Sequence, residues 1–495
     1  MKYLVFVTGL ILSGIFASQQ ACSQDAIMNS LKTHSDDYTQ FSSLSNRSHW
    51  GTYNVHDPAC IKVGEYFYLY STDAIYIPEG RIFKDDSVKM GHIQVRRSKD
   101  LVNWEFMGWA FEQIPQDAAM HIRTHNNGKG ADGIWAPYII KVGKEFRLYY
   151  AVSAFGKNVS YIGLAVSNSP MGPWKFRGPV VKTTSADVMN AIDPTVIRDE
   201  ASGRTWMIYG SYFGGIYCVE LNLKSGLCAK SGDKGTCIAK RKEGDAKIIE
   251  APDVIYNPEL KKYYLFVSYD PLFTHYNVRV GRSDKPEGPY YDFFGNDMAE
   301  PVDHLPTLTY AYRFENHPGW AGVAHCNEIN DRGRYFMFHQ GRLAPDNLQL
   351  NLHVREMGWL PSGWPVVSPE RFAGTGLVKA SKESLQGDWE VIFLNDISDS
   401  VRLCQGQIPP GGWSYSRKEF NNSMPVHFSS DGTLELNQFI NWNLNGDNLI
   451  EFKTKAGEKV YAILFSAYDW ENKKETIVFS GIAPSGYSFW GKKIK

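Results

Sequence analysis

Three carboxylic acids, Asp57, Asp193 and Glu250, open similar segments of the chain at long intervals, and a proline follows each of them within two residues at the start of a β-rich run. Two carboxyl groups on opposite sides of a glycosidic bond can hydrolyse it, one as general acid and the other as general base. A third acid close by would help the general acid keep its proton, because like charges disfavour joint ionisation. Buried carboxylates are costly unless paired. Three of them in one repeated position therefore favour acid and base chemistry over a structural role.

A weak repeat would position these acids. Its five copies begin at Asp57, Trp135, Asp193, Glu250 and His325. Each copy contains a β-rich run, a turn that suits a hairpin and a second, aromatic-rich run. With about four strands per repeat, five repeats predict an all-β, five-bladed β-propeller. The innermost strand of every propeller blade points its first residues toward one centre, so we expect these five residues to meet there.

The long repeat is exhausted soon after Gly363-Trp-Pro365. We therefore expect the propeller, the catalytic domain, to occupy residues 34–370. Turn signals at intervals of about ten residues then continue to the end of the chain. They predict a second domain at 381–495, a small antiparallel β-barrel or sandwich.

The N-terminus and the charge balance suggest where the protein works. Met1-Lys2 is followed by an apolar stretch from Tyr3 to Ala17, which predicts a signal peptide over residues 1–22. The protein is then exported, as a periplasmic, cell-surface or secreted protein, and the sequence leaves open whether Cys22 carries a lipid anchor. With 52 Lys and Arg against 53 Asp and Glu, the chain lacks the basic surplus that binding to nucleic acid needs.

Seven cysteines in 495 residues do not form a disulfide framework. Export would permit disulfides, and Cys228 with Cys237 is the most plausible pair. None of the cysteines has the CxxC spacing of a metal site.

A set of motifs between about residues 50 and 370 resembles the family 43 glycoside hydrolases, and among them the endo-acting α-1,5-L-arabinanases. The part after residue 381 is similar to the lipocalin-like barrel domain of the larger members. The motifs are His56-Asp-Pro58, Ile134-Trp-Ala-Pro137, Ser153-Ala-Phe-Gly156, Ala191-Ile-Asp-Pro194, Gly210-Ser-Tyr-Phe-Gly-Gly215, Glu250-Ala-Pro252 and Gly322-Val-Ala-His325.

The resemblance implies a role for each acid. Asp57 would be the general base that activates water and Glu250 the general acid, while Asp193 would tune the pKa of Glu250 and orient it. The reaction would invert the anomeric carbon without a covalent intermediate, which requires carboxyl groups about 6.5–9.5 Å apart. The substrate would be a polysaccharide, the arabinan of pectin side chains, and the enzyme a monomer.

Further residues could bind the sugar or a metal. Trp135 and Phe155 are candidate stacking platforms for sugar rings. The resemblance places a structural calcium ion near His325, although the family's Gly-His-Asn pattern is replaced here by Ala324-His325-Cys326. Side chains that could hydrogen-bond sugar hydroxyls are Ser153, Asn158, Ser160, Asn190 and Tyr212.

Two other functions remain open. An exo-acting α-L-arabinofuranosidase or β-xylosidase would use the same scaffold with differently closed loops. A sugar-binding propeller without catalysis is the other alternative, but binding alone does not require three acids at the starts of inner strands.

Overall fold

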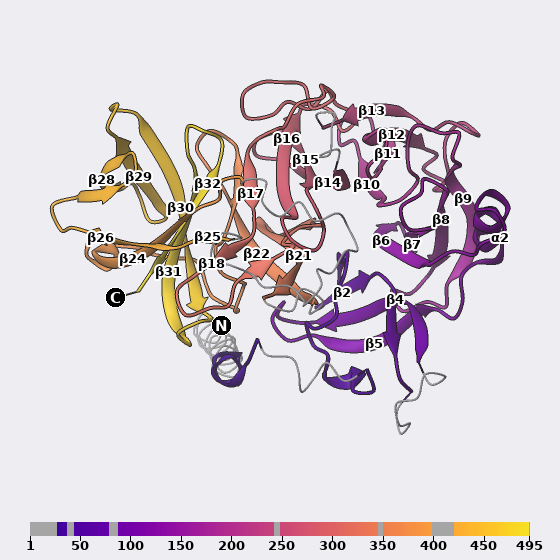
Figure 1. The fold of residues 1–495 in the computed structure, drawn as a ribbon, viewed down its shortest axis with the longest axis horizontal. Helices are drawn as coiled ribbons and strands as arrows, with labels where there is room; N and C mark the ends of the chain where they lie inside the picture. The colour runs from indigo at the N-terminus through magenta and orange to yellow at the C-terminus, as the bar shows by residue number, and fades with distance from the viewer. Residues whose placement is uncertain are drawn as a thin grey trace, which may run out of the picture.

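The computed structural model describes residues 27–36, 44–78, 88–241, 248–344, 350–397 and 420–494. The expected signal peptide and Cys22 lie outside these residues. Figure 1 shows radiating β-sheets on the right of the molecule and a curved, barrel-like sheet on the left. The fold is therefore all-β, as predicted.

Four sheets form propeller blades, each built from consecutive antiparallel strands. The first contains β1 (Ala59–Val63), β2 (Tyr66–Ser71), β3 (Ala74–Tyr76), β4 (Lys89–Ser98) and β5 (Glu105–Phe111). The second contains β6 (Gly133–Val142), β7 (Glu145–Ser153), β8 (Ser160–Ser167) and β9 (Lys175–Thr183). The third contains β10 (Thr195–Arg198), β11 (Thr205–Tyr209), β12 (Ile216–Leu221) and β13 (Thr236–Ala239). The fourth contains β14 (Ile249–Asn257), β15 (Lys262–Tyr269), β16 (Asn277–Ser283) and β17 (Thr307–Thr309).

A seven-stranded sheet follows these four blades. Its strands are β18 (Tyr312–Arg313), β19 (Trp320–Ala321), β20 (Asn327–Asp331), β21 (Arg334–Leu343), β22 (Leu350–Trp359), β23 (Pro365–Val367) and β25 (Asn421–Asn422). The strands β1, β6, β10, β14 and β20 contact one another in a ring. Strand β25, from the C-terminal part of the chain, pairs in parallel with β18.

The C-terminal sheet has eight strands in the order β26-β24-β32-β31-β30-β29-β28-β27. Their bounds are β24 (Gly387–Phe393), β26 (Met424–Phe428), β27 (Thr433–Leu436), β28 (Phe439–Leu444), β29 (Leu449–Thr454), β30 (Lys459–Asp469), β31 (Lys474–Ile482) and β32 (Ser488–Lys493). The end strands β26 and β27 contact each other, so the sheet is nearly closed into a barrel.

Short helices complete the described fold: η1 (Arg47–His49), α2 (Gln116–His125) and α3 (Lys382–Leu385). None of the helices in the described ranges is long and apolar enough to cross a membrane.

The predicted hairpins are present at the start of each repeat. Gly64 (φ 63°) and Gly143 (φ 62°) each lie in the two-residue connection of a hairpin, β1–β2 and β6–β7. Positive φ at such positions matches the twist of the flanking strands and suits glycine. Pairing of β10 with β11, β14 with β15 and β20 with β21 confirms the other three hairpins.

The propeller and the C-terminal sheet share one hydrophobic core. Buried Tyr312 and Val366 from the seven-stranded sheet pack in one cluster with Ile463 and Trp490 from the C-terminal sheet. The rings of Tyr312 and Trp490 lie 5.2 Å apart. The C-terminal sheet is thus packed firmly against the propeller.

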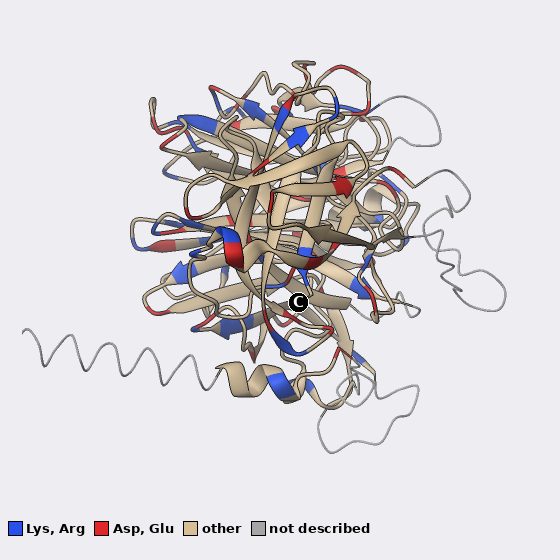
Figure 2. Ribbon diagram, turned by 90° about the vertical axis from the view of Figure 1, so that its left-hand side faces the viewer, with Lys and Arg blue, Asp and Glu red and all other residues tan. Residues whose placement is uncertain are grey.

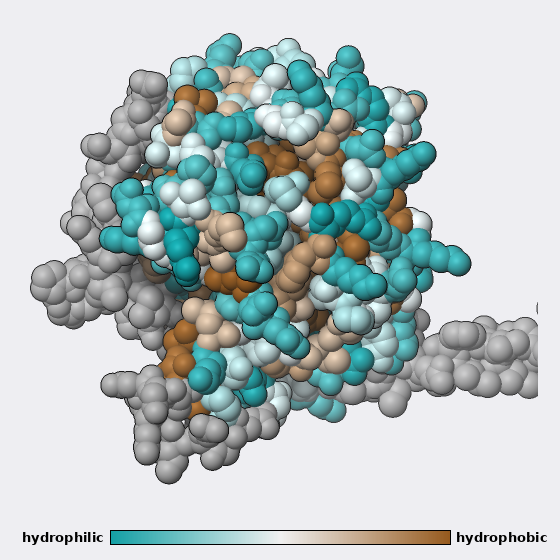
Figure 3. All heavy atoms as spheres, turned by 90° about the vertical axis from the view of Figure 1, so that its right-hand side faces the viewer, coloured by the Kyte–Doolittle hydropathy of each residue, from teal (hydrophilic) through white to brown (hydrophobic). Residues whose placement is uncertain are grey.

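The two sides of the molecule in view show no large patch of one charge or of hydrophobic residues. Basic and acidic residues are interspersed over the side of the C-terminal sheet (Figure 2). On the opposite side, over α2 and β9, hydrophobic residues occur in small groups among hydrophilic ones (Figure 3).

The proposed disulfide is wrong, because Cys228 and Cys237 are both free. The Cys228 thiol lies 3.4 Å from the carbonyl of Asp233. The Cys237 thiol lies 3.6 Å from the carbonyl of Gly214. Each thiol therefore contacts main-chain oxygen and not the other cysteine.

Candidate active site

Residues with left-handed backbone geometry mark the centre of the ring. Positive φ angles occur at Asp57 (51°), Ala136 (38°), Asp193 (55°), Ala251 (52°) and His325 (56°). Such angles are uncommon for residues other than glycine. Their recurrence in the segments that open β1, β6, β10, β14 and β20 shows that one local conformation turns the chain into each of these strands.

The sequence repeat was aligned one residue too early in two copies. Ala136 and Ala251, and not Trp135 and Glu250, are the structural equivalents of Asp57. The pairing register shifts in both strands, after Trp135 in β6 and after Glu250 in β14. A β-bulge re-aims a side chain locally. It therefore allows Glu250 to reach the same centre from a different direction.

Asp57 lies in an environment that favours its charged form. Its Oδ1 atom is 2.8 Å from Nδ1 of His325 and 3.5 Å from Nε2 of His56. The Thr72 hydroxyl donates a hydrogen bond of 2.6 Å to Oδ2. Burial alone would raise the pKa of Asp57, but the two histidines and the Thr72 bond outweigh burial and hold it well below its ordinary value. Asp57 is thus an ionised carboxylate at neutral pH.

Asp193 and Glu250 have the opposite tendency. Burial, together with the neighbouring carboxylates of Glu250 and Asp57, raises the pKa of Asp193 to about 8. Burial also raises the pKa of Glu250, although a 2.8 Å hydrogen bond from the Ser211 hydroxyl opposes the shift. The Ala251 N–H group donates to Asp193 at 3.1 Å, which links the two acids through the backbone. These two acids therefore retain protons in a range where Asp57 is charged.

His325 is the cation of this group. Its N–H group donates to the Ser268 hydroxyl at 3.0 Å, which fixes the backbone. Burial would lower the pKa of the imidazole, but the carboxylates of Asp57, Asp193 and Glu250 raise it to about 9. The protonated ring thus balances the charge of Asp57.

The donor set near His325 suits a cation only with water as most of its ligands. Calcium prefers six to eight oxygen ligands. Within the described ranges, the only group of three side chains close enough together to hold an ion is elsewhere, at Glu370, Asp469 and Glu471. Asp57 already pairs with the imidazole. The side chains around His325 therefore do not form a complete calcium shell by themselves.

The two candidate stacking residues lie together. Phe155 is 54% exposed, and its ring is 6.5 Å from the ring of Trp135 in an edge-on arrangement. The Phe155 N–H group donates to Asp132, which holds the loop that presents the ring. An exposed aromatic ring fixed in this way can stack on a sugar.

The candidate hydrogen-bonding residues are mostly engaged with one another. The Ser153 and Ser160 hydroxyls lie 2.7 Å apart, and Ser160 donates to Oδ1 of Asn190 at 2.6 Å. Asn158 donates to the carbonyls of Asp187 and Met189. Tyr212 has a left-handed backbone with φ 53°, and its N–H group donates to the carbonyl of Ile249, beside Glu250.

Three contacts of the acids were missed from the sequence. Thr72 holds Asp57, Ser211 holds Glu250, and the Tyr276 hydroxyl also hydrogen-bonds Glu250. Ser211 does follow Gly210 in a motif noted above. Thr72 directly follows β2, and Tyr276 directly precedes β16. No repeated spacing in the sequence points to either residue.

A family model for glycosyl hydrolases family 43 matches residues 51–365, more than half of the chain. The chain belongs to glycosyl hydrolase family 43. A second model, for a C-terminal lipocalin-like domain, matches residues 369–491 of this family 43 protein.

Individual relatives of the hydrolase agree with this assignment. It is 27% identical over 486 residues to an extracellular endo-α-(1→5)-L-arabinanase from Thermotoga petrophila, covering 89% of this chain and 94% of the relative. It is 30% identical to an extracellular exo-α-(1→5)-L-arabinofuranosidase from Cellvibrio japonicus, covering 63% and 86%. A crystal structure of an endo-1,5-α-L-arabinanase from T. petrophila superimposes with a TM-score of 0.72 at 26% identity, covering 89% and 98%. The protein is therefore a glycoside hydrolase.

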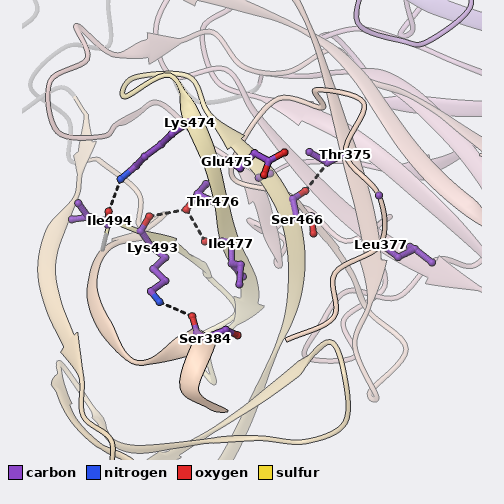
Figure 4. Close-up of a pocket in the computed structure, with 12 residues that line it drawn as sticks. Thr375, Leu377, Ser384, Ser466, Lys474, Glu475, Thr476, Ile477, Lys493 and Ile494 are labelled. Atoms are coloured by element: carbon purple, nitrogen blue, oxygen red, sulfur yellow. Dashed lines mark hydrogen bonds between the residues drawn. The ribbon is translucent and has the colours of Figure 1, made fainter. Parts of the chain in front are cut away.

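A separate hollow of the hydrolase lies on its C-terminal sheet. It measures about 480 Å³ and lies between the β30–β31–β32 surface and the segment that contains Thr375 and Leu377 (Figure 4). Lys474 donates to the carbonyl of Ile494 and Lys493 to that of Ser384 at its edge. Glu475 is its only carboxylic acid. Because two carboxyl groups are needed for glycoside hydrolysis, this hollow is not the catalytic centre.

Proposed function

We propose that this hydrolase cleaves internal α-1,5-L-arabinofuranosidic bonds of arabinan with inversion. The observation that carries the proposal is the opposite state of two neighbouring carboxyl groups. The pKa of Asp57 is lowered and that of Glu250 is raised. Titratable groups whose pKa values are pushed apart in one site are suited to be the base and the acid of one reaction.

Each acid has one task in the proposed mechanism. Asp57, ionised and held by Thr72 and His325, accepts a proton from the attacking water. Glu250, protonated, donates to the oxygen that leaves the anomeric carbon. Asp193 stays close enough to keep the proton on Glu250 and bonds to the backbone that carries it. Water attacks the anomeric carbon from the face opposite the leaving group, so the configuration inverts.

The names of the relatives support the substrate. Both an endo-acting arabinanase and an exo-acting arabinofuranosidase are similar to this chain. The two relatives that match 89% of the chain are both endo-acting. A shorter endo-acting relative and the exo-acting one match 64% and 63%. Trp135 and Phe155 would stack on arabinose rings. Ser153, Asn158, Ser160, Asn190 and Tyr212 would shape and contact the sugar subsites.

The same reasoning extends to architecture and location. We propose that β20 to β23 form the fifth blade, since β20 closes the ring between β14 and β1. The catalytic domain would span 34–370 and the C-terminal domain 381–495. Export through the predicted signal peptide would agree with the extracellular relatives, and the protein would act as a monomer.

A structural calcium ion near His325 remains part of the proposal. When bound, a cation with water as most of its ligands would lower the pKa of nearby carboxyls. Treatment with a chelator should then lower both activity and the unfolding temperature, and added Ca²⁺ should restore them. Unchanged activity after complete chelation would rule the ion out.

Glu250→Gln tests the function directly. With linear and branched arabinan, the native enzyme should release a ladder of oligomers, whereas an exo enzyme would release single sugars. The variant should lose about 10²–10⁴-fold in kcat on arabinan, the usual contribution of a general acid. A fold unchanged by circular dichroism is the control. Binding of arabinan without any cleavage by the native chain would instead favour the sugar-binding alternative.

A further inference from the structure

A chain of polar contacts connects the C-terminal part of the molecule to the surroundings of Glu250. It begins at Asp396, just after β24, whose Oδ1 lies 2.6 Å from Nη2 of Arg279 in β16. The Tyr487 hydroxyl donates to the other oxygen of Asp396 at 2.7 Å. Arg279 is only 2% exposed and Asp396 is 50% exposed. The contact therefore ties a buried guanidinium of the propeller to a surface acid of the C-terminal part.

Arg279 contacts Asn277, which in turn holds the turn formed by residues 270–276. Its Nε donates to Oδ1 of Asn277 at 2.6 Å. The Asn277 amide donates to Oδ2 of Asp270 at 2.8 Å, and also to the carbonyls of Tyr269 and His275. Asn277 is completely buried. A buried amide with its donors and acceptor used holds both ends of the 270–276 turn in one geometry.

The 270–276 turn places Tyr276 beside Glu250. Tyr276 is 1% exposed, its N–H group donates to the carbonyl of Pro271 at 3.1 Å, and its hydroxyl hydrogen-bonds Glu250. The opposite side of the turn is held by Arg241, which is 2.6 Å from Asp270 and donates to the carbonyl of Ile248. Ile248 lies two residues before Glu250. The turn and the strand that carries the acid are thus held by the same network.

We propose that Asp396 is a positioning residue for the general acid Glu250. It acts through Arg279 and Asn277, which fix the turn that presents Tyr276. The inference rests on the proposed function, because it gives Glu250 the role of acid. It assigns a task to the C-terminal part of the chain: by completing this network, that part keeps the acid aligned with the leaving oxygen.

The chemistry of the leaving group separates positioning from general damage to the fold. Departure of an arabinose oxygen needs the proton of the acid, whereas departure of 2,4-dinitrophenolate does not. Linear 1,5-arabinan and a 2,4-dinitrophenyl arabino-oligosaccharide are therefore assayed with the same preparation of full-length enzyme. The ratio of the two kcat values does not depend on the fraction of enzyme that is folded.

Asp396→Asn keeps the shape and removes the charge that holds Arg279. We expect kcat on arabinan to fall about fivefold, a typical size for a coupling that travels through a network. KM should stay nearly constant, and kcat on the dinitrophenyl substrate should change by about twofold or less. An equal fall on both substrates, or no fall on arabinan, would overturn the inference.

Two further variants complete the test. Thr375→Val removes a 2.7 Å hydrogen bond from the Thr375 hydroxyl to the carbonyl of Ser466 in β30, which joins the segment after the propeller to the C-terminal sheet outside the network, and should leave the ratio unchanged. Tyr487→Phe removes only the hydroxyl that supports Asp396. It should move the ratio in the same direction by less, and an unchanged ratio counts against the inference even if Asp396→Asn does not fold.

Glu250→Gln is measured alongside these variants. If it does not discriminate between the two substrates, the proposed role of Glu250 fails. If it discriminates and Asp396→Asn does not, the positioning inference fails alone.

Discussion

Two of the buried groups of acids in the described part of the chain each face one cation. At the centre of the propeller, His325 lies 2.8 Å from Asp57, and its imidazole is not hydrogen-bonded to Asp193 or Glu250 in any contact of the described residues. Between the propeller and the C-terminal sheet, Lys492 contacts four carboxylates. Its partners, at 2.6 to 3.5 Å, are Glu370, Glu390, Asp469 and Glu471.

The difference lies in how the positive charge is shared. An ammonium group has three donors that can point at several acceptors. Burial would raise the pKa of Glu471, but Lys492 outweighs it and lowers that pKa to about 2. The imidazole at the hub pairs directly with Asp57, and its positive charge lowers the pKa of Asp193 too little to offset burial and the neighbouring carboxylates, which raise that pKa to about 8. Each acid at Lys492 contacts the shared cation, which suits a cluster that joins two parts of a fold, although burial and the neighbouring Glu471 still raise the pKa of Glu370. At the hub, Asp193 and Glu250 have no direct contact with the cation among the described residues, and such acids can exchange protons.

Removing the shared cation should have the largest effect. Lys492→Met leaves four carboxylates buried without their partner, and removal of one member of a buried ion pair costs about 3–5 kcal/mol. We expect the free energy of unfolding, measured with urea, to fall by this amount near pH 7. The loss should shrink toward pH 4, because the stranded acids can then take up protons. The kcat of the folded fraction should be nearly unchanged.

Lys493→Met is the matched control. Lys493 is the next residue of β32, and its ammonium donates to the carbonyl of Ser384. Its loss should cost less than about 1 kcal/mol, since that bond is partly exposed. Comparable losses for the two variants would show that the four acids do not depend on Lys492. Glu250→Gln should show the reverse pattern, with lost activity and no loss of the free energy of unfolding.

The features that follow from the sequence repeat, the inner strands with their acids and the hairpins, could be predicted from the sequence. Acids far apart in the chain meet because each lies at the start of an inner strand, Asp57 and Asp193 just before β1 and β10 and Glu250 within β14. The nearby prolines mark these starts in the sequence. The hairpins of the repeats follow from glycine-containing turns such as Gly64 and Gly143. The family and the type of fold could therefore be inferred before any coordinates.

Features that depend on local backbone or on distant packing were not predictable. The bulge after Glu250 changes the register by one residue, and the sequence Glu250-Ala-Pro gives no sign of which residue takes the positive φ. Tyr276 reaches the acid through a turn with no repeated spacing. The parallel pairing of β25 with β18 brings together segments about a hundred residues apart, and two-residue strands have no periodicity to detect.

Asp193→Asn tests whether an acid at the hub that does not contact His325 directly retains its proton. The expected effect on stability is smaller than that of Lys492→Met. Burial and the neighbouring carboxylates raise the pKa of Asp193 to about 8, above its ordinary value of 3.8. A carboxyl whose pKa is higher in the folded state than in the unfolded state loses stability as the pH rises between these two values. Asp193→Asn has no carboxyl at this position, so its stability does not fall in this pH range. Its unfolding temperature should match that of the native enzyme near pH 4 and exceed it by about 2–4 °C near pH 8.

Asp199→Asn is the matched control, and its stability relative to the native enzyme should change with pH in the opposite direction. Asp199, at the exposed turn of the same blade, accepts a hydrogen bond from the Ser202 hydroxyl, which lowers its pKa. The folded carboxylate of Asp199 ionises below its ordinary pKa of 3.8, so Asp199→Asn should lose a little stability relative to the native enzyme as the pH rises through that value, with no further change at higher pH. The slopes of the two variants against pH, measured by calorimetry, should differ in sign. If Asp193→Asn gained nothing between pH 4 and 8, Asp193 would not retain a proton at the hub in this pH range, and the contrast between the two groups of acids would no longer explain which one does chemistry.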